Sequence, residues 1–265
     1  MRRFSARYLE DTRRGMWDGS RDALAPLELD SHELIVDVGA GTGELTAVLT
    51  EESPATVVAV DRDRSLLQSF DGSGVQSDAM ALGMADDTAD LVVCQALLIN
   101  LPDPGRALGE FKRCSNDRVG AIEPDNSQVH VESSVGAETR LTRNARDDYI
   151  TGVTTDVALG DASTLFEDTG FENVETRRYN LVRTIEPPYD ERAIRAAKRK
   201  ATASRLATQR ETLLAGGMTV QDYEQLREDW REMGRSVVKA MQNETYNRRE
   251  TIPFYVTTGT VPENA

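Results

Sequence analysis

Three glycines alternate with other residues directly after a short apolar run, and this stretch is the first place where the sequence could bind a ligand. The run Leu34–Val38 is rich in β-branched residues, which is typical of a central strand covered on both faces. Gly39, Gly41 and Gly43 follow it, and glycine permits both a sharp turn and a close approach of a ligand to the main chain. A helix is predicted to begin near Glu44, so that its free N–H groups face the ligand.

The spacing of these glycines distinguishes two kinds of nucleotide site. A dinucleotide site requires G-x-G-x-x-G, but the third glycine would fall at Glu44 or at Thr46, so neither register fits. The stretch from Asp37 to Gly43 reads Asp-x-Gly-x-Gly-x-Gly instead. This spacing favours a ligand without a pyrophosphate, and Asp37 could meet a cationic amino group. A tight strand-to-helix turn without any ligand is the plain alternative.

An acidic residue ends the second predicted strand, at residues 56–60. The carboxylate of Asp61 could accept hydrogen bonds from both hydroxyls of a ribose. A role as N-cap of the next helix is compatible with this. Arg62 follows it and could lie against an adenine ring. The sequence therefore favours a nucleoside at this edge of the sheet.

The motif from Asp37 to Gly43 resembles the first signature of the class I S-adenosylmethionine-dependent methyltransferases. After a fourth predicted strand at 90–95, the segment Leu101-Pro102-Asp103-Pro104 resembles the small-molecule branch of these enzymes, which is the type 11 or UbiE-like branch. It lacks the Asn-Pro-Pro-Tyr or Asp-Pro-Pro-Tyr motif of the DNA amino-methylating enzymes, so a DNA base is disfavoured as acceptor.

The resemblance implies S-adenosyl-L-methionine as cofactor and assigns further residues to its site. It places Asp78 at the adenine amino group, the main-chain N–H of Ala79 at a ring nitrogen, and Gln95 near the methionine end. The predicted cofactor-binding residues are Asp37, Gly39, Ala40, Gly41, Gly43, Asp61, Arg62, Asp78, Ala79 and Gln95.

The order of the predicted elements indicates an α/β protein. We expect a Rossmann-like seven-stranded sheet with an antiparallel last strand and helices on both faces. We predict an N-terminal helical extension at 1–30, a methyltransferase core at 31–186 plus 250–265, and a helical cap insertion at 187–249. The extension would either fold over the cofactor or pack on the sheet edge. Residues 126–160 are predicted as an insertion of mixed character.

Two features mark the predicted cap. Apolar residues recur at intervals of three and four from Tyr223 to Met241, which predicts an amphipathic helix, and Thr219 with Asp222 forms a capping box before it. Residues 191–210 are rich in arginine and lysine. This basic segment could attract an anionic substrate or RNA. A solvated helix face is favoured instead, because no aromatic residues interleave with the charges.

The net charge of −14 comes from acids spread along the chain, and only four of the 31 basic residues are lysines. Such a surface indicates a halophilic archaeon, where salt screens the repulsion between carboxylates; an ordinary acidic bacterial enzyme is the alternative. No apolar run reaches the roughly 20 residues that span a membrane, and no secretory signal is recognised. Cys94 and Cys114 have neither metal nor redox spacing. We therefore expect a cytoplasmic protein without membrane contact.

No histidine and cysteine pattern in the sequence suggests a metal site. His32 is expected at the surface, and His130 is a candidate general base, with a packing or surface role as the alternative. The predicted function is methyl transfer to a small-molecule acceptor by in-line SN2 displacement. A non-catalytic cofactor-binding subunit, an NAD-dependent oxidoreductase and an RNA methyltransferase are alternatives. The acceptor and the oligomeric state are not predicted, because one core carries many caps.

Overall fold

The computed structural model describes residues 5–13, 15–68 and 72–262, without the side chains at 7, 8, 10 and 11. The chain divides into two compact units, which are described separately. Unit 1 consists of Met1–Asp125, Leu159–Tyr179 and Phe254–Ala265, and unit 2 of Asn126–Ala158 and Asn180–Pro253. The predicted cap at 187–249 lies within unit 2, which also takes in residues 126–158.

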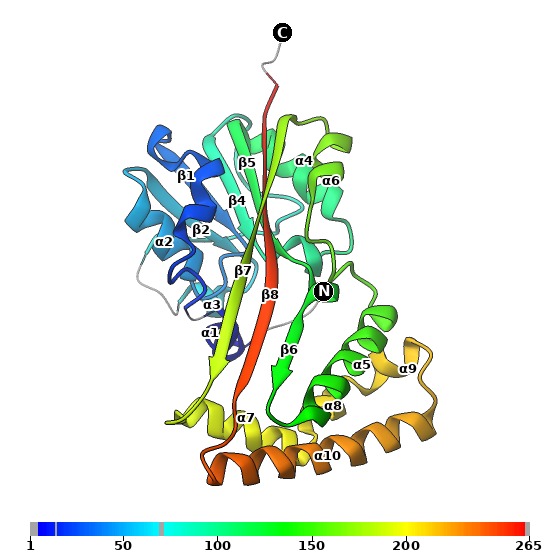
Figure 1. The fold of residues 1–265 in the computed structure, drawn as a ribbon. Helices are drawn as coiled ribbons and strands as arrows, with labels where there is room; N and C mark the ends of the chain where they lie inside the picture. Colours follow the sequence, from blue (N-terminus) through cyan, green and yellow to red (C-terminus); the bar gives the residue numbers. More distant parts are fainter. Residues whose placement is uncertain (1–4, 14, 69–71, 263–265) are drawn as a thin grey trace. The chain divides into compact units, whose positions relative to one another are not determined.

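A mixed sheet of eight strands runs through the protein (Figure 1). Seven of the strands follow the order β3-β2-β1-β4-β5-β8-β6, and β7 also pairs with β8. The strands are β1 (Leu34–Val38), β2 (Thr56–Asp61), β3 (Gly74–Gln76), β4 (Ala89–Gln95), β5 (Ser115–Pro124), β6 (His130–Ser133), β7 (Glu172–Ile185) and β8 (Arg248–Thr260). The first five are parallel, whereas β8 is antiparallel to β5. The predicted α/β class with an antiparallel last strand is confirmed.

Helices of unit 1 cover the parallel strands and close a core around them. They are α2 (Glu44–Glu52), α3 (Arg64–Leu67), α4 (Pro104–Cys114) and α6 (Ser163–Asp168). Phe111 of α4 and Phe166 of α6 have no exposed surface, and neither do the residues of β4 from Leu91 to Cys94. Because the central strands β1 and β4 are covered on both faces, they read as largely apolar runs. Their carboxyl ends meet at one edge, where ligands bind in open α/β sheets.

The segment before β1 forms α1 (Ala6–Arg13) and two 3-10 helices, η1 (Arg21–Leu27) and η2 (Leu29–Ser31). Leu27 is fully buried and packs on β5 at Gly120, where a Cβ atom would lie 2.4 Å from the Leu27 side chain. The expectation that His32 lies at the surface is wrong. His32 is 3% exposed, and its Nε2 atom lies 2.8 Å from the main-chain oxygen of Leu27, because this apolar segment folds over it.

Unit 2 contains α5 (Gly136–Gly152), α7 (Glu191–Thr202), α8 (Ser204–Thr208), α9 (Arg210–Ala215), α10 (Val220–Gln242) and the short η4 (Asn126–Gln128). The sequence analysis did not predict α5 or β6 within the mixed segment 126–160. Helix α5 buries only Glu138, Leu141 and Ala145, so it has a short apolar stripe and a weak helical pattern. Strand β6 pairs with the start of β8. It has only four residues, which is too short for the alternating pattern of a strand to be recognised in the sequence.

The apolar stripe on α10 is buried as the sequence predicts. Tyr223, Trp230 and Val237 are at most 8% exposed and belong to one cluster with residues of α5 and α7. The Thr219 hydroxyl accepts a hydrogen bond from the N–H of Asp222 at 3.1 Å, which confirms Thr219 as the N-cap of helix α10. A Cβ atom at Gly234 would lie 2.3 Å from the main-chain nitrogen of Ala201, so α10 and α7 cross in direct backbone contact.

A buried carboxylate organises the polar interior of unit 2. Glu138 is fully buried and accepts hydrogen bonds from Ser133 Oγ at 2.7 Å, from Tyr246 OH at 2.9 Å and from Lys200 Nζ. Its Oε1 atom lies 3.2 Å from Arg248 Nε. Burial alone would raise the pKa of Glu138, but the charges of Lys200 and Arg248 lower it overall. Lys200, from the predicted basic segment, is thus engaged inside the protein.

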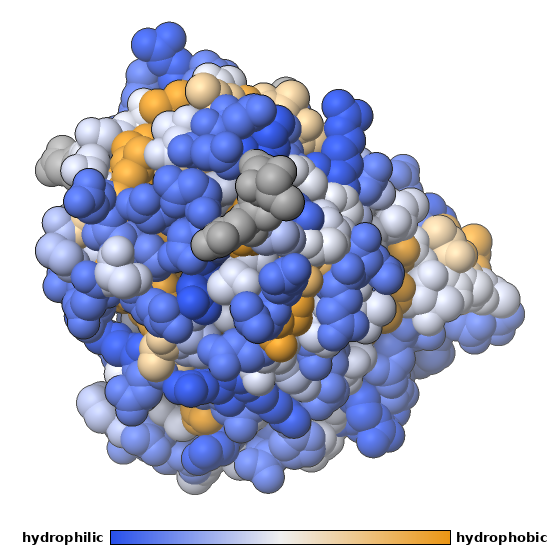
Figure 2. Space-filling model, turned by 90° about the horizontal axis from the view of Figure 1, so that it is seen from above, coloured by the Kyte–Doolittle hydropathy of each residue, from blue (hydrophilic) through white to orange (hydrophobic). Residues whose placement is uncertain are grey.

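The surface of the described residues carries few large apolar side chains. The exposed ones are Val75, Val182, Ile194 and Val220. The face drawn in Figure 2 is mostly hydrophilic, with small separate apolar areas. Within residues 5–13, 15–68 and 72–262, no helix has the length and apolar character needed to cross a bilayer.

Candidate functional site

The turn after β1 has a conformation that requires glycine. Gly39, Gly41 and Gly43 have φ angles of 75°, 60° and 85°, which side chains disfavour. The turn is also crowded from above. A Cβ atom at Gly39 would lie 2.8 Å from Leu97 Cδ1, and one at Gly41 would lie 2.9 Å from Leu9 Cδ1. The three glycines therefore form a cradle in which Gly39 and Gly41 have no room for side chains.

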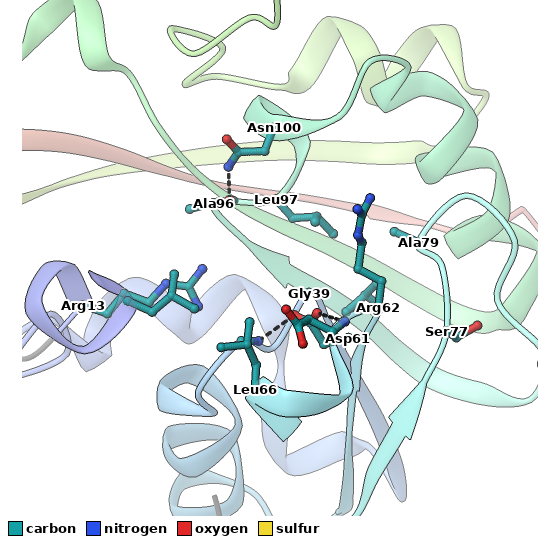
Figure 3. Close-up of a pocket in the computed structure, with 14 residues that line it drawn as sticks. Arg13, Gly39, Asp61, Arg62, Leu66, Ser77, Ala79, Ala96, Leu97 and Asn100 are labelled. Atoms are coloured by element: carbon teal, nitrogen blue, oxygen red, sulfur yellow. Dashed lines mark hydrogen bonds between the residues drawn. The ribbon is translucent and has the colours of Figure 1, made fainter. Parts of the chain in front are cut away.

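A cavity of about 240 Å³ opens above this cradle (Figure 3). Five of the ten predicted site residues line it, namely Gly39, Gly41, Asp61, Arg62 and Ala79. Figure 3 shows Arg13 at one end and Ser77 with Ala79 at the other, with Gly39 and Asp61 between them. The cavity thus runs along the carboxyl ends of four neighbouring strands, from β4 across to β3.

Asp61 joins the turns that follow β1 and β2. Its carboxylate is 9% exposed and accepts a hydrogen bond from the N–H of Gly41 at 3.0 Å and from the N–H of Asp63 at 2.8 Å. The main-chain oxygen of Val60, the residue before it, accepts from the N–H of Gly39 at 2.7 Å. The acid therefore holds the cradle in shape and lines the cavity at the same time.

Two predicted site residues lie directly behind the lining and carry buried polar atoms. Asp37 is 1% exposed; its Oδ2 atom accepts from Thr46 Oγ1 at 2.6 Å, and burial raises the pKa of its carboxyl to about 6. Gln95 is 2% exposed, and its Nε2 atom lies 2.9 Å from Met16 Sδ. Among the described residues, Asp37 Oδ1 and Gln95 Oε1 have no hydrogen-bond partner.

The other predicted residues lie outside the lining. Ala40 is buried within the turn, Gly43 is the N-cap of α2, and Asp78 is exposed with its Oδ1 atom accepting from the N–H of Met80 at 2.9 Å. His130 belongs to β6 in unit 2. Its side chain is 66% exposed, and Nε2 lies 3.8 Å from Glu132 Oε1. The structure brings five residues together and leaves these four apart from the cavity surface.

Helix α1 supplies lining residues that the sequence analysis did not assign to the site. Leu9 and Arg13 line the cavity, so the N-terminal extension contacts the site as well as the sheet. Lining residues after β3 and β4 were also missed, among them Ser77, Leu97 and Asn100. Their position directly after predicted strands was the available signal, because loops at these ends build the ligand site.

Glu123 is a further residue that the sequence analysis did not assign. It is the penultimate residue of β5, is fully buried, and accepts hydrogen bonds from the N–H groups of Leu97 at 3.0 Å and Leu98 at 2.8 Å. It thereby fixes the short helix η3 (Leu98–Asn100), which borders the cavity. Burial raises the pKa of its carboxyl to about 7. An acid inside an apolar strand was the signal for it.

We expect Glu123→Gln to flatten the pH dependence of stability between about pH 5 and 7. The folded pKa is raised from 4.5 to about 7, so the folded state binds the proton more tightly than the unfolded chain. The free energy of unfolding therefore falls as the pH rises through this range, by about 1–3 kcal/mol from this group. Urea unfolding of the wild type and of Glu123→Gln at pH 5, 6, 7 and 8 measures this change in the free energy of unfolding. Parallel pH profiles for the two proteins would contradict a raised pKa at Glu123.

Three comparisons place this geometry among known proteins. Residues 36–118 match the Methyltransf_11 model, a methyltransferase domain. The demethylmenaquinone methyltransferase of Lactiplantibacillus plantarum is 26% identical over 188 residues, which cover 61% of this chain and 79% of that protein. The trans-aconitate 2-methyltransferase of an Azoarcus strain is 36% identical over 100 residues, which cover 36% of this chain and 39% of that protein. The chain is an S-adenosylmethionine-dependent methyltransferase.

A solved structure supports the fold of this methyltransferase. A Bacillus halodurans protein assigned as a methyltransferase superposes with a TM-score of 0.52, at 13% identity, over 91% of this chain and 98% of that one. At this identity the likeness concerns the fold alone. It agrees with the expected Rossmann-like sheet and its antiparallel last strand.

The cavity of the methyltransferase suits its cofactor chemically. The glycine cradle lets a ligand approach the main chain, and the Asp61 carboxylate borders the same space. Two further oxygens, Asp37 Oδ1 and Asn100 Oδ1, are buried without a hydrogen-bond partner among the described residues. Buried polar atoms of this kind are costly unless a ligand or water satisfies them, and a cofactor with ribose hydroxyls and an ammonium group carries the matching donors.

Proposed function

We propose that this methyltransferase transfers the methyl group of S-adenosylmethionine to a small-molecule acceptor. The observation that carries the proposal is the glycine cradle held by Asp61 at the cavity floor. Two similar proteins, the demethylmenaquinone and trans-aconitate enzymes, act by name on small molecules. Both similarities cover only part of this chain, so the acceptor class is our inference from them.

The proposed cofactor contacts follow the order of residues along the cavity. Asp61 accepts from the ribose hydroxyls, Ala79 and Asp78 meet the adenine edge, and Arg62 lies against the adenine face. Asp37 and Gln95 are assigned to the methionine end, where their buried, unpartnered oxygens could accept hydrogen bonds from the ligand. Gly39, Ala40, Gly41 and Gly43 give the main chain its close approach.

The proposed mechanism requires little acid–base catalysis by the protein. The sulfonium of the cofactor supplies an activated methyl group for in-line SN2 displacement. The chain orients the two reactants and excludes water, a task for the apolar lining residues Leu9, Val38 and Leu97. His130, whose ring is exposed on β6, remains a candidate base only if an acceptor requires deprotonation.

The test of the proposed function is the release of S-adenosylhomocysteine. The purified protein is incubated with S-adenosylmethionine and fractions of a small-molecule extract, with an RNA fraction in parallel. We expect turnover with a small-molecule fraction, and its loss in the Asp61→Ala variant. Turnover with the RNA fraction alone would overturn the acceptor class, and failure of the wild type to bind S-adenosylmethionine would overturn the site.

We further propose that the protein works in the reducing cytoplasm of a halophilic archaeon. Support comes from the net charge of −14 on a lysine-poor chain and from two buried, free cysteines. We expect the melting temperature to rise steeply between about 0.1 M and 2 M salt, because salt screens repulsion between carboxylates. Thermal melts in sodium chloride and potassium chloride measure this, and equal melting temperatures at both concentrations would contradict the halophile assignment.

A further inference from the structure

Charged side chains gather on the covered face of the sheet in unit 2, where β8 runs between β6 and β7 (Figure 1). Glu250 of β8 lies opposite the buried Val131 of β6, and Arg248 shares its face, because side chains of a strand alternate between the two faces. Arg248 Nη2 donates to Glu250 Oε1 at 2.9 Å, and Arg183 Nη1 of β7 lies 4.0 Å from Glu250 Oε2. One carboxylate thus lies between two guanidinium groups.

Two helices bring further arginines to the same acid. Arg146 of α5 donates through Nη1 to the main-chain oxygen of Val129 at 2.6 Å, and Arg205 of α8 is exposed. Burial alone would raise the pKa of Glu250, but arginine charges lower it overall, those of Arg248 and Arg205 among them. The charge of Glu250 in turn acts on Arg146. The resulting arginine cluster consists of Arg146, Arg183, Arg205 and Arg248.

Among the described residues, the acids of this region do not balance its cations. The principal charged groups that act on the arginine cluster and on Glu250 are the five cations Arg146, Arg183, Lys200, Arg205 and Arg248 and the three acids Glu138, Asp147 and Glu250. Burial lowers the pKa of the half-buried Arg146, and the charges of Glu250 and Asp147 do not restore it. An additional anion would stabilise this guanidinium. A net positive region of this kind stands out in a chain of net charge −14.

A ligand can reach the arginine cluster from solvent. Arg205 is exposed, and the side chains of Arg183 and Glu250 keep 24% and 20% of their surface exposed. A guanidinium carries its N–H donors in a planar fork that matches the oxygens of carboxylate and phosphate groups. A ligand with two or more negative charges would offset the excess of cations, whereas Glu250 opposes such a ligand because it already pairs with Arg183 and Arg248.

We propose that unit 2 binds a multivalent oxyanion at the arginine cluster, namely the phosphate group or the di- or tricarboxylate group of a small molecule. Arg146 and Arg205 are the principal ligands of this anion, because Glu250 pairs with Arg183 and Arg248. Every residue of the site belongs to unit 2, so the proposal is independent of the cofactor contacts proposed for unit 1.

Calorimetry on the full chain at constant ionic strength tests the site with two probes, inorganic phosphate and citrate. We expect at least one probe to bind at a single site per chain. Arg205→Gln should weaken that binding by about fivefold or more, because it removes a charge-assisted hydrogen-bond donor at an exposed position. Glu250→Gln removes the competing carboxylate and should strengthen the binding by about threefold or more.

A matched control comes from another helix of unit 2. Arg235 of α10 is exposed and lies outside the arginine cluster, so Arg235→Gln makes the same change of charge and should alter the affinity by less than about twofold. Equal weakening by Arg205→Gln and Arg235→Gln would overturn the proposal, because the anion would then respond only to overall charge.

The two probes also distinguish the source of the oxyanion. Binding of phosphate alone would assign a phosphate group, binding of citrate alone would assign carboxylates, and binding of both would support the shared oxyanion chemistry. The lack of binding of either probe up to about 10 mM would overturn the proposal. A Glu250→Gln variant that keeps its melting temperature but binds no more tightly would overturn it as well, and Arg205→Gln decides the case if Glu250→Gln does not fold.

Discussion

Asp61→Ala is expected to weaken S-adenosylmethionine binding by at least tenfold. The variant would remove the two proposed hydrogen bonds to the ribose, and a bond to a charged acceptor contributes about 1.5–3 kcal/mol. Each 1.4 kcal/mol corresponds to a factor of ten in affinity. Calorimetry with S-adenosylmethionine and with S-adenosylhomocysteine measures the loss directly, and an unchanged affinity in a folded variant would overturn the assignment of the site.

The structure changes how that experiment must be controlled. The sequence suggests that a residue at a strand tip can be replaced without cost to the fold. Asp61 also accepts from the N–H groups of Gly41 and Asp63, so alanine loosens the cradle as well. Asp61→Asn keeps one oxygen acceptor at similar size and should show an intermediate affinity. Near-equal melting temperatures of the variants would assign the loss to the ligand contact, not to the turn.

The same titration tests the oxidoreductase alternative. NADH is expected to bind neither the wild type nor Asp61→Ala, because Glu44 and Thr46 stand where a dinucleotide site has its third glycine. Tight NADH binding would contradict the methyltransferase site.

Trp230→Ala is expected to destabilise unit 2 by about 3–5 kcal/mol, the range for removing a large aromatic side chain from a core. Trp230 is 8% exposed and lies on α10 within a cluster that includes Leu226 and Met233. The measurement is urea unfolding followed by helical circular dichroism. A change below about 0.5 kcal/mol would show that the helix is peripheral.

The control for this variant lies two residues away on the same helix. Glu228 is exposed, so Glu228→Ala removes a side chain of α10 without opening a cavity. We expect a change within about 0.5 kcal/mol, as for surface positions generally. A large effect of Glu228→Ala would mean that helix propensity or charge, and not burial, determines the result at Trp230.

The parallel half of the sheet could be predicted because its signals are local. The run Leu34–Val38, the three glycines and the acid at position 61 each fix the backbone within a few residues. The observed β1, β2 and β4 accordingly begin and end within one residue of their predicted ranges.

Other parts depend on contacts between residues far apart in the chain, which no local pattern reports. Helix α5 carries Glu138 on its buried face, where an apolar residue would be expected, because Lys200 and Arg248 pair with it. The break after α7 falls at Ala203, which has a φ of 52° and is neither glycine nor proline. Arg13 could be identified as part of the cavity only once α1 was seen over Gly41.

The chain passes between the two units four times, at residues 125–126, 158–159, 179–180 and 253–254. Unit 2 is therefore made of two excursions, each of which leaves the methyltransferase core and returns to it. Glu138 belongs to the first excursion, whereas Lys200, Tyr246 and Arg248 belong to the second. A chimera that exchanges one excursion with a homologue would separate the buried Glu138 carboxylate from its ion-pair partners Lys200 and Arg248. The two excursions share one polar interior, so a graft between homologues should transfer them together.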